Sequence, residues 1–221
     1  DVFTINHRWL AAYTEELARR GLHTPFETIS REDRLNEAVI RTLAEMGCYR
    51  LWVGAESGSQ RILDAMQRQT NVERVVEIVH LLKRYGIETG MFIMLGYEGE
   101  ELADLDSTVQ TLKDANPDIF LTTVAYPIAG TPFYEKVKDR VIPLKAWHEG
   151  SDSDQTIVGR RSRRFYRHAT RWMVGEVDFN RQRFATSPNY ARMARALVNA
   201  KMGRLGMLLT QHQTERGSRE S

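Results

Sequence analysis

The sequence contains very little cysteine and no long apolar run. Its single cysteine, Cys48, excludes an internal disulfide and a cysteine-based zinc site within these 221 residues. Such low cysteine use fits a reducing compartment, and we expect a cytoplasmic protein. No stretch approaches the roughly 18 consecutive apolar residues of a membrane span, and the first residues lack the basic and apolar segments of a signal peptide. We therefore expect a soluble protein with no membrane span.

Two common nucleotide-binding patterns are absent, and so is any metal-ligand pattern of histidines. There is neither a phosphate loop of the G-x4-G-K type nor a G-x-G-x2-G dinucleotide motif, which argues against a nucleotide triphosphatase and a dehydrogenase. The six histidines show no pair at metal-ligand spacing with acidic or sulfur partners: His7, His23, His80, His148, His168 and His212. No residue of this chain is therefore assigned to a metal.

Charge is unevenly divided along the chain, although the formal net charge is only +2. Residues 1–150 carry 17 basic and 23 acidic side chains, a net −6, whereas residues 151–221 carry 14 and 6, a net +8. This asymmetry marks a boundary between two parts of the chain. We predict one part over residues 1–140 and a mostly helical, basic extension over residues 141–221.

Between residues 24 and 138, short β-rich runs alternate with helical patterns, which is typical of parallel strand-helix units. The predicted strands cover residues 24–29, 49–54, 89–95 and 118–125. The helices between them carry apolar residues at three- and four-residue spacing: Leu35, Val39, Leu43 and Met46; Val72, Val75, Val76, Val79 and Leu82; Leu102, Leu105, Val109 and Leu112. Each helix has one apolar face to bury against a sheet, so we expect an α/β fold.

Glycine and short polar residues mark the predicted helix ends. Gly47 and Gly86 stand where a left-handed residue ends a helix, and Asp33 and Asn71 stand where an N-cap begins one.

One more helix is predicted over residues 7–20, preceded only by the tail of a strand over residues 2–5. Because the chain begins at Asp1 rather than at methionine, we expect that one or more earlier strand-helix units are missing.

After Lys138 the strand-helix pattern ends. A loop with Ser151, Asp152, Ser153 and Asp154 precedes two basic helices, predicted over residues 161–177 and 188–209. The polar end, residues 214–221, is expected to fray.

The stretch 160–168, with Arg171 and Trp172, interleaves basic and aromatic residues as nucleic-acid binders do. The favoured interpretation is an amphipathic helix whose apolar side chains pack on the core while its arginines face water. Those apolar side chains are Phe165, Ala169, Trp172 and Met173.

Polar or glycine-rich segments follow three of the predicted strands, at residues 54–59, 94–100 and 126–131. Parallel strand-helix folds bind ligands at the carboxyl ends of their strands, because the loops there meet at one rim. The sequence therefore predicts a polar small-molecule site at this rim.

Four motifs, in this order, resemble those of radical S-adenosylmethionine (SAM) enzymes. They are Glu45-Met46-Gly47-Cys48 with residues 51–59, Ile62-Leu63 and Met66; Gly86-Ile87; residues 92–96 with Glu100; and Ala129-Gly130-Thr131. Residues 1–4 resemble the end of the family's second strand, in the branch that often carries a cobalamin domain and includes anaerobic magnesium-protoporphyrin ester cyclases. The resemblance covers residues 1–138.

This resemblance implies the later strand-helix units of a partial parallel α/β barrel, like part of a TIM barrel, followed by a helical C-terminal extension. It implies an enzyme that reductively cleaves SAM at a 4Fe-4S cluster, for methyl transfer or ring and cyclisation chemistry, in some members with cobalamin. A small-molecule substrate and an external electron donor would be its partners.

The resemblance also implies a set of SAM-binding residues. Glu56, with Ser57 beside it, would hold the ammonium group, and Arg68, on the following helix, would return toward the carboxylate as a two-pronged donor. The strand around Met94 would offer backbone groups to adenine, with Gly96 allowing close approach. Tyr126 and Pro127 would supply a flat apolar wall near the base.

The sequence departs from the family pattern in three places. The C-x3-C-x2-C loop that holds the cluster is absent, and Cys48 alone cannot replace three thiolates, so this chain is expected to be inactive by itself. Ala129 replaces a usual proline, and Tyr97-Glu98 replaces a usual apolar-proline pair.

Simpler interpretations remain open for the same residues. Glu56 would then be a solvated loop acid, Arg68 a surface charge, and Ser57 and Ser59 caps of the next helix. Gly96 and Gly99 would serve only a turn, and Cys48 would be a small buried hydrophobe. For the whole chain, the alternative is a non-catalytic binding module whose basic helices contact a protein or nucleic-acid partner.

Overall fold

The computed structural model describes residues 3–144 and 154–215. The chain forms two compact units: the first comprises Asp1–Ile93 and Leu102–Thr123, and the second comprises Met94–Glu101 and Val124–Ser221. The boundary predicted near residue 140 stays a prediction.

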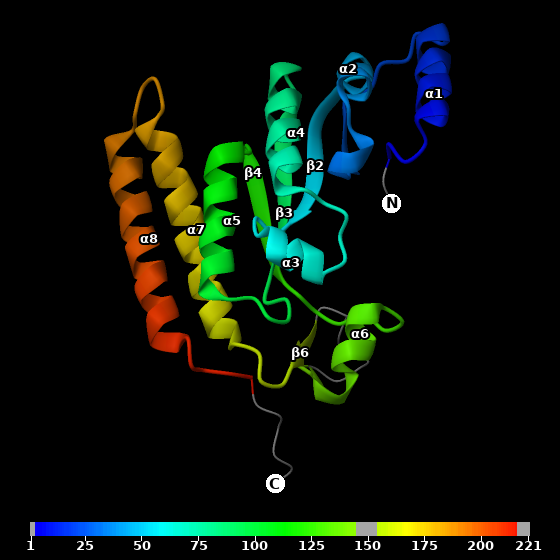
Figure 1. Cartoon of the computed structure of the whole chain (residues 1–221). Coiled ribbons are helices and arrows are strands. Elements are labelled where there is room, and N and C mark those ends of the chain that lie inside the picture. The colour runs from blue at the N-terminus through cyan, green and yellow to red at the C-terminus, as the bar shows by residue number, and fades with distance from the viewer. Residues whose placement is uncertain (1–2, 145–153, 216–221) are drawn as a thin grey trace. The chain divides into compact units, whose positions relative to one another are not determined.

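The first unit alternates strands and helices, as the sequence pattern predicts (Figure 1). Its elements are α1 (His7–Arg19), β1 (Phe26–Ser30), the 3-10 turn η1 (Glu32–Arg34), α2 (Glu37–Glu45), β2 (Cys48–Glu56), α3 (Gln60–Ala65), α4 (Val72–Arg84), β3 (Glu88–Leu95), α5 (Leu102–Ala115) and β4 (Ile119–Val124). The strand order is β1-β2-β3-β4, and β2 pairs in parallel with both β1 and β3. Parallel pairing requires a crossover between successive strands, and the helices supply it.

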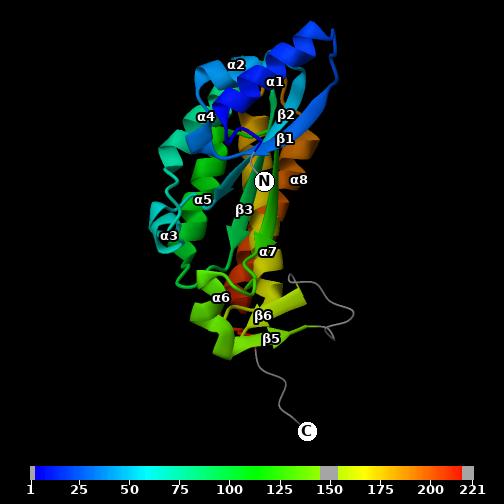
Figure 2. The same cartoon turned by 90° about the vertical axis from the view of Figure 1, so that its right-hand side faces the viewer.

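The sheet of the first unit has two different faces. Helices α2, α4 and α5 lie along one of them (Figure 2). Leu51, Val53 and Ala55 of β2 are buried there, each at most 1% exposed. The alternate residues, beginning with Arg50 and Trp52, point to the opposite face, where they are only partly buried. A strand places successive side chains on opposite faces, so β2 separates its apolar and polar residues in this way.

Most of the predicted helix ends are confirmed. Gly47 and Gly86 adopt φ values of 95° and 74° after α2 and α4, and the side chain of Asn71 accepts a hydrogen bond from the Arg74 amide. The predicted N-cap Asp33 is wrong. It lies in η1, and Asn36 caps α2 instead, because the intervening 3-10 turn moves the helix start downstream.

The predicted strand over residues 2–5 is wrong for its described part. Residues 3–5 form a turn and bend, although the Phe3 amide donates to the Ile29 carbonyl at 3.3 Å. Val2 lies outside the described residues.

The second unit contains two long helices that follow one another in the chain, and a small two-stranded sheet. Its elements are α6 (Pro132–Val137), η2 (Lys138–Arg140), β5 (Val141–Pro143), β6 (Gln155–Ile157), α7 (Arg163–Arg183) and α8 (Tyr190–Thr210). Strands β5 and β6 pair antiparallel. The sequence did not predict these strands, because three residues are too few to show a period. Of the predicted loop before them, Ser151, Asp152 and Ser153 lie outside the described residues.

Helix α7 confirms the amphipathic interpretation of the basic stretch. Phe165, Ala169, Trp172 and Met173 are at most 5% exposed, whereas Arg163, Arg164 and Arg167 are exposed. The predicted fraying is wrong for Thr214 and Glu215, since Thr214 pairs with Arg161 and the Glu215 amide donates to the Arg160 carbonyl at 2.8 Å. Residues 216–221 lie outside the described range.

Helices α7 and α8 pack side by side (Figure 1). A Cβ atom on Gly203 would lie 2.5 Å from the Trp172 amide nitrogen and 2.7 Å from its Cα, so this crossing depends on glycine.

We predict that Gly203→Ala destabilises the protein by about 1 to 2 kcal/mol, because overpacking against backbone exceeds the gain in helix propensity. Urea unfolding of the full chain would measure this. Lys201→Ala, an exposed change on the same helix, is the control and should be close to neutral. Equal stability of Gly203→Ala and the control would contradict the close packing.

Candidate ligand site at the strand ends

Glu56 ends β2 in a strained backbone conformation. Its φ is +61°, a left-handed value that non-glycine residues rarely adopt, and the register of β2 with β3 shifts between Gly54 and Glu56. Such strain costs of order 1–3 kcal/mol and persists only where the surroundings impose it. A strained residue at a strand end is therefore a candidate for function.

The turn after Glu56 is fixed against α5. A Cβ atom on Gly58 would lie 2.5 Å from the Thr108 Cα, and the Gly58 amide donates to the Thr108 hydroxyl at 3.0 Å. The Ser57 hydroxyl accepts from the Ser59 amide at 3.1 Å, and the Ser59 hydroxyl donates to Asp104 at 2.6 Å. Ser57, predicted as part of the SAM site, is only 3% exposed and here stabilises the turn.

Arg68 comes back to Glu56 in the structure. Its Nη2 atom lies 3.3 Å from Oε1 of Glu56 and donates to the Gly54 carbonyl at 3.2 Å. The expectation that Arg68 lies on a helix is wrong: α3 ends at Ala65, and Gln67, with a φ of 55°, reverses the chain. This turn, rather than a helix face, brings the guanidinium to the strand end.

The Glu56–Arg68 pair is partly buried and incompletely satisfied. The Glu56 side chain is 17% exposed and that of Arg68 is 32% exposed. Burial raises the pKa of the Glu56 carboxyl, an effect that the charge of Arg68 only partly offsets. The Nε atom of Arg68 is buried without a hydrogen-bond partner. Glu56 is therefore not a fully solvated loop acid, and the role of both residues toward SAM stays a prediction.

On the same face of β2, sequence reasoning missed a polar and aromatic surface. Arg50 bridges Glu27 at 3.0 Å and Glu88 at 2.8 Å. The Trp52 indole donates to Glu27 at 3.2 Å and stacks on Phe92, with ring centroids 4.9 Å apart at an interplanar angle of 17°. The alternation Arg50, Trp52, Gly54, Glu56 was the available signal, since every second residue of a strand shares a face.

The second unit holds the other predicted site residues. Met94 and Tyr126 are partly buried and Pro127 is buried, and the Ala125 amide donates to the Leu95 carbonyl at 2.7 Å, which joins the two strand ends. Gly96 has a φ of 74°, and a Cβ atom there would lie 2.7 Å from the Tyr166 ring. Gly96 is therefore required for packing, whatever its role toward a ligand.

The two departures from the family loop have local partners. Tyr97 stacks on Phe133 with ring centroids 4.9 Å apart. Glu98 forms ion pairs with Arg140 and, at 3.4 Å, with Lys136, and these cations hold the pKa of Glu98 below its usual range. Ala129 is exposed.

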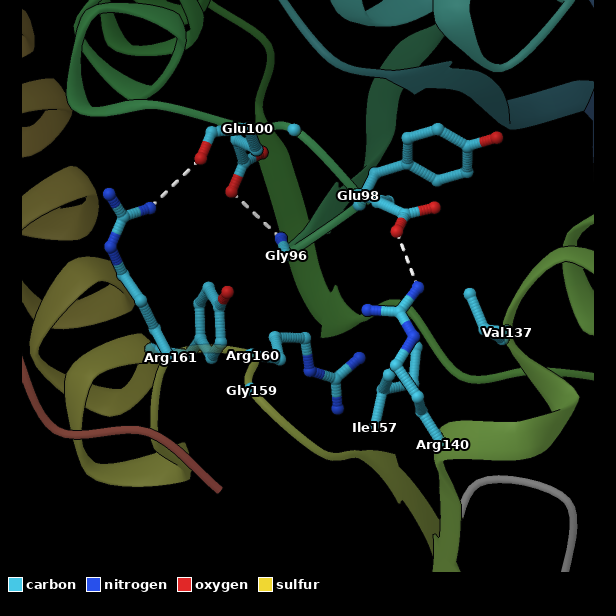
Figure 3. Close-up of a pocket in the computed structure, with 12 residues that line it drawn as sticks. Gly96, Glu98, Glu100, Val137, Arg140, Ile157, Gly159, Arg160 and Arg161 are labelled. Atoms are coloured by element: carbon cyan, nitrogen blue, oxygen red, sulfur yellow. Dashed lines mark hydrogen bonds and ion pairs between the residues drawn. The ribbon is translucent and has the colours of Figure 1, made fainter. Parts of the chain in front are cut away.

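A cavity of about 330 Å³ opens beside this loop, within the second unit (Figure 3). It is lined by residues 96–100, Val137, Arg140, Ile157, Gly159, Arg160, Arg161 and Tyr166. Sequence reasoning treated Arg160 and Arg161 only as part of a basic helix. The two arginines in fact precede α7, and Val158 and Gly159 separate them from β6.

Cys48 does not have the features of a cluster ligand. Cys48 is the only cysteine; burial raises the pKa of its thiol to about 11, and its sulfur donates to the Arg50 carbonyl. It is the small buried hydrophobe that the sequence predicts. Over residues 3–144 and 154–215, no group of three His, Cys, Asp or Glu side chains could hold a metal ion, and no helix is long and apolar enough to cross a membrane.

Residues 5–112 match the family described as Radical SAM superfamily. An uncharacterized methyltransferase of Pyrococcus horikoshii is 26% identical over 158 residues, which are 71% of this chain and 34% of that protein. The anaerobic magnesium-protoporphyrin IX monomethyl ester cyclase of Rubrivivax gelatinosus is 26% identical over 144 residues, 62% of this chain and 25% of the cyclase. The chain thus spans about a third or less of the length of these curated relatives.

Solved structures of the same fold have low sequence identity. The radical S-adenosylmethionine methyltransferase TsrM of Kitasatospora setae, with cobalamin and a [4Fe-4S] cluster bound, superposes with a TM-score of 0.57 at 11% identity, covering 89% of this chain and 48% of TsrM. The cobalamin-dependent S-adenosylmethionine radical enzyme OxsB, with aqua-cobalamin bound, gives 0.55 at 13% identity, covering 91% and 36%. These likenesses confirm the predicted fold class.

The curated relatives named here are enzymes by their names, which favours the catalytic interpretation over a non-catalytic binding module. The parallel strand-helix units and the family match agree with the motifs found in the sequence. Residues 5–112 match the radical SAM superfamily, the family that the sequence motifs resemble.

Proposed function

We propose that this chain binds the methionine end of SAM at Glu56 and Arg68, as part of an enzyme that uses SAM for methyl transfer or ring and cyclisation chemistry. The observation that carries the proposal is the partly buried pair itself. A carboxylate stands beside a guanidinium whose Nε has no partner, at a strained strand end.

The charge pattern of the pair complements an amino acid. An α-amino acid carries its ammonium and carboxylate groups on one carbon atom, so a binding site needs an anion and a cation side by side. Glu56 would accept from the ammonium group, and the Nε and Nη atoms of Arg68 would donate to the carboxylate in a two-pronged contact. Burial would strengthen both contacts, because water competes less with them.

Met94, Gly96, Tyr126 and Pro127 would surround the adenosine. The support is their position at the ends of β3 and β4, where the Ala125 amide joins Leu95. The Tyr126 ring and Pro127 offer flat apolar surface, and the glycine at position 96 leaves the backbone uncovered.

A 4Fe-4S cluster would be held by cysteines outside these 221 residues. Once reduced by an external electron donor, that cluster would supply the electron for the reductive cleavage of SAM. Cobalamin, present in the structural relatives TsrM and OxsB, would add methyl-transfer chemistry in the complete protein. The role of this chain would be to bind and orient these groups. We also propose that the protein is cytoplasmic, because its single cysteine fits a reducing compartment.

The aromatic surface beside Glu56 would face the substrate. Trp52 and Phe92 stack into one flat platform on the face of β2 that Gly54 shares, and a Cβ atom on Gly54 would lie 3.2 Å from Oε1 of Glu56. Such a platform suits a planar, apolar part of a small molecule. The cyclase relative, by its name, acts on a protoporphyrin ester, which is of this class.

We predict that Glu56→Ala weakens SAM binding by about tenfold or more, because a buried charge-assisted hydrogen bond contributes about 1.5–3 kcal/mol. Isothermal titration calorimetry of SAM with the full-length protein would measure the affinity. Glu73→Ala, which removes an exposed carboxylate from α4, is the matched control and should bind like the parent protein. Unchanged affinity in Glu56→Ala would remove Glu56 from the site.

Arg68→Lys is predicted to weaken SAM binding by about tenfold although the charge is kept, because lysine lacks the Nε donor and the planar fork. The same titration would measure it, with Arg84→Lys, an exposed change on α4, as the control. Full affinity in Arg68→Lys would mean that Arg68 acts only as a point charge.

Stability and binding should respond to Glu56 in opposite directions. The folded-state pKa of Glu56 is raised above its unfolded value, so the folded protein loses stability as pH rises through that raised pKa. Glu56→Gln should therefore raise Tm at pH 7, by about 2–4 °C for each 1 kcal/mol of relieved desolvation, and the gain should vanish near pH 4. SAM affinity of the parent protein should fall as Glu56 becomes protonated. A lower Tm for Glu56→Gln at pH 7 would instead make the ion pair a structural one.

A further inference from the structure

The cavity in the second unit is distinct from the proposed SAM site. Of the predicted SAM-binding residues only Gly96 lines it; Met94, Tyr126 and Pro127 do not. Three arginines converge on it from two segments, Arg140 at the end of η2 and Arg160 and Arg161 before α7 (Figure 3). Its volume of about 330 Å³ is within the range of small-molecule sites.

The carboxylates of the cavity are already engaged. Glu98 pairs with Arg140 and Lys136. The Glu100 carboxylate accepts from the Gly96 amide at 2.8 Å, which closes the loop on itself. Arg161 donates to the backbone carbonyl of Glu100 at 2.9 Å and lies over the Phe165 ring. These contacts fix the walls of the cavity.

Arg160 lines the same cavity but keeps a hydrogen-bond donor without a partner. Its Nη atoms donate to the Ala125 carbonyl and, at 2.8 Å, to the Thr156 hydroxyl, so both of these partners are uncharged. Its Nε atom is buried without a hydrogen-bond partner. No carboxylate of the described residues forms an ion pair with it, and burial lowers its pKa, although an arginine stays charged at neutral pH. Figure 3 shows Arg140 extending to Glu98 and Arg160 among the residues that line the same cavity.

The Arg160 guanidinium has lost part of its hydration without gaining a carboxylate partner, whereas Arg140 is paired with Glu98 and 44% exposed. An oxyanion in the cavity would supply the acceptor that Nε of Arg160 lacks, and Arg140, which lines the same cavity, would be the second cation. The remaining wall is apolar, since Val137 and Ile157 are at most 4% exposed and the Tyr166 ring is buried.

We infer that this cavity binds a small organic anion through its carboxylate or phosphate group, held between Arg140 and Arg160, with its apolar part against Val137, Ile157 and Tyr166. The ligand is a second small molecule beside SAM, so the inference does not depend on the proposed SAM contacts. Because Arg160 also donates to the Ala125 carbonyl, the bound anion would order the end of β4.

The test is to titrate the full-length protein with inorganic phosphate and, separately, with acetate, against sodium chloride at equal ionic strength. Binding would be followed by calorimetry and by Tm. We expect saturable binding and a rise in Tm with at least one of the two anions, and preference between them identifies the group as phosphate or carboxylate. A rise that matches sodium chloride and does not saturate would overturn the inference.

Three variants locate the binding. Arg160→Gln should weaken anion affinity by about tenfold or more, and Arg140→Gln, whose parent side chain is 44% exposed and which should fold normally, should weaken it by a similar factor. Arg164→Gln, an exposed change on α7, is the control and should leave it unchanged. Parent-like anion affinity in Arg140→Gln would overturn the inference even if Arg160→Gln does not fold. SAM affinity should be the same in Arg140→Gln and the parent, which separates this site from the SAM site.

Discussion

The turn that follows β2 is the constraint on which the candidate site depends. Gly58 packs directly on the backbone of α5 at Thr108, and Ser59 is tied to Asp104 of the same helix. With the chain fixed on both sides, Glu56 is held at a φ of +61° that it would not adopt freely. The carboxylate therefore meets Arg68 at the strand end without either side chain having to be ordered by a ligand, which reduces the entropic cost of binding one.

The two faces of β2 differ: one packs in the core, and the other carries the candidate site. The residues that face α2, α4 and α5 are apolar and fully buried, and they fix the register of the sheet. The other face carries the ion pairs of Arg50 and the Trp52–Phe92 stack. These side chains are only partly buried, so part of the aromatic surface stays exposed. A one-residue slip would exchange the two sets, so the packing of the helices also guarantees the position of the candidate substrate surface.

The second unit carries charged residues around the loop that follows β3. The loop after β3 departs from the family pattern at Tyr97 and Glu98, and both residues find partners within this unit, Phe133 and the cations Arg140 and Lys136. The same loop forms one wall of the arginine-lined cavity. A change that looks like a loss of a family motif thus coincides with a distinct local arrangement of charges.

Much of the fold could be predicted from the sequence, because strand and helix periods, Asn71, Gly47 and Gly86 act locally. The same holds for the family resemblance, whose motifs are contiguous in the chain. The start of α2 at Asn36, the strands β5 and β6, and the ordered Thr214 could not, because they depend on a short turn or on pairing between distant residues.

The sequence by itself determined the α/β pattern, the radical SAM motifs and the identity of Glu56 and Arg68 as candidates. Only the tertiary structure decided that their charges meet at 3.3 Å, that Trp52 lies on Phe92, and that Arg160 turns into a cavity instead of toward water. The physical reason is that burial and unmet hydrogen bonds arise from residues far apart in the chain, and no local period or propensity records them.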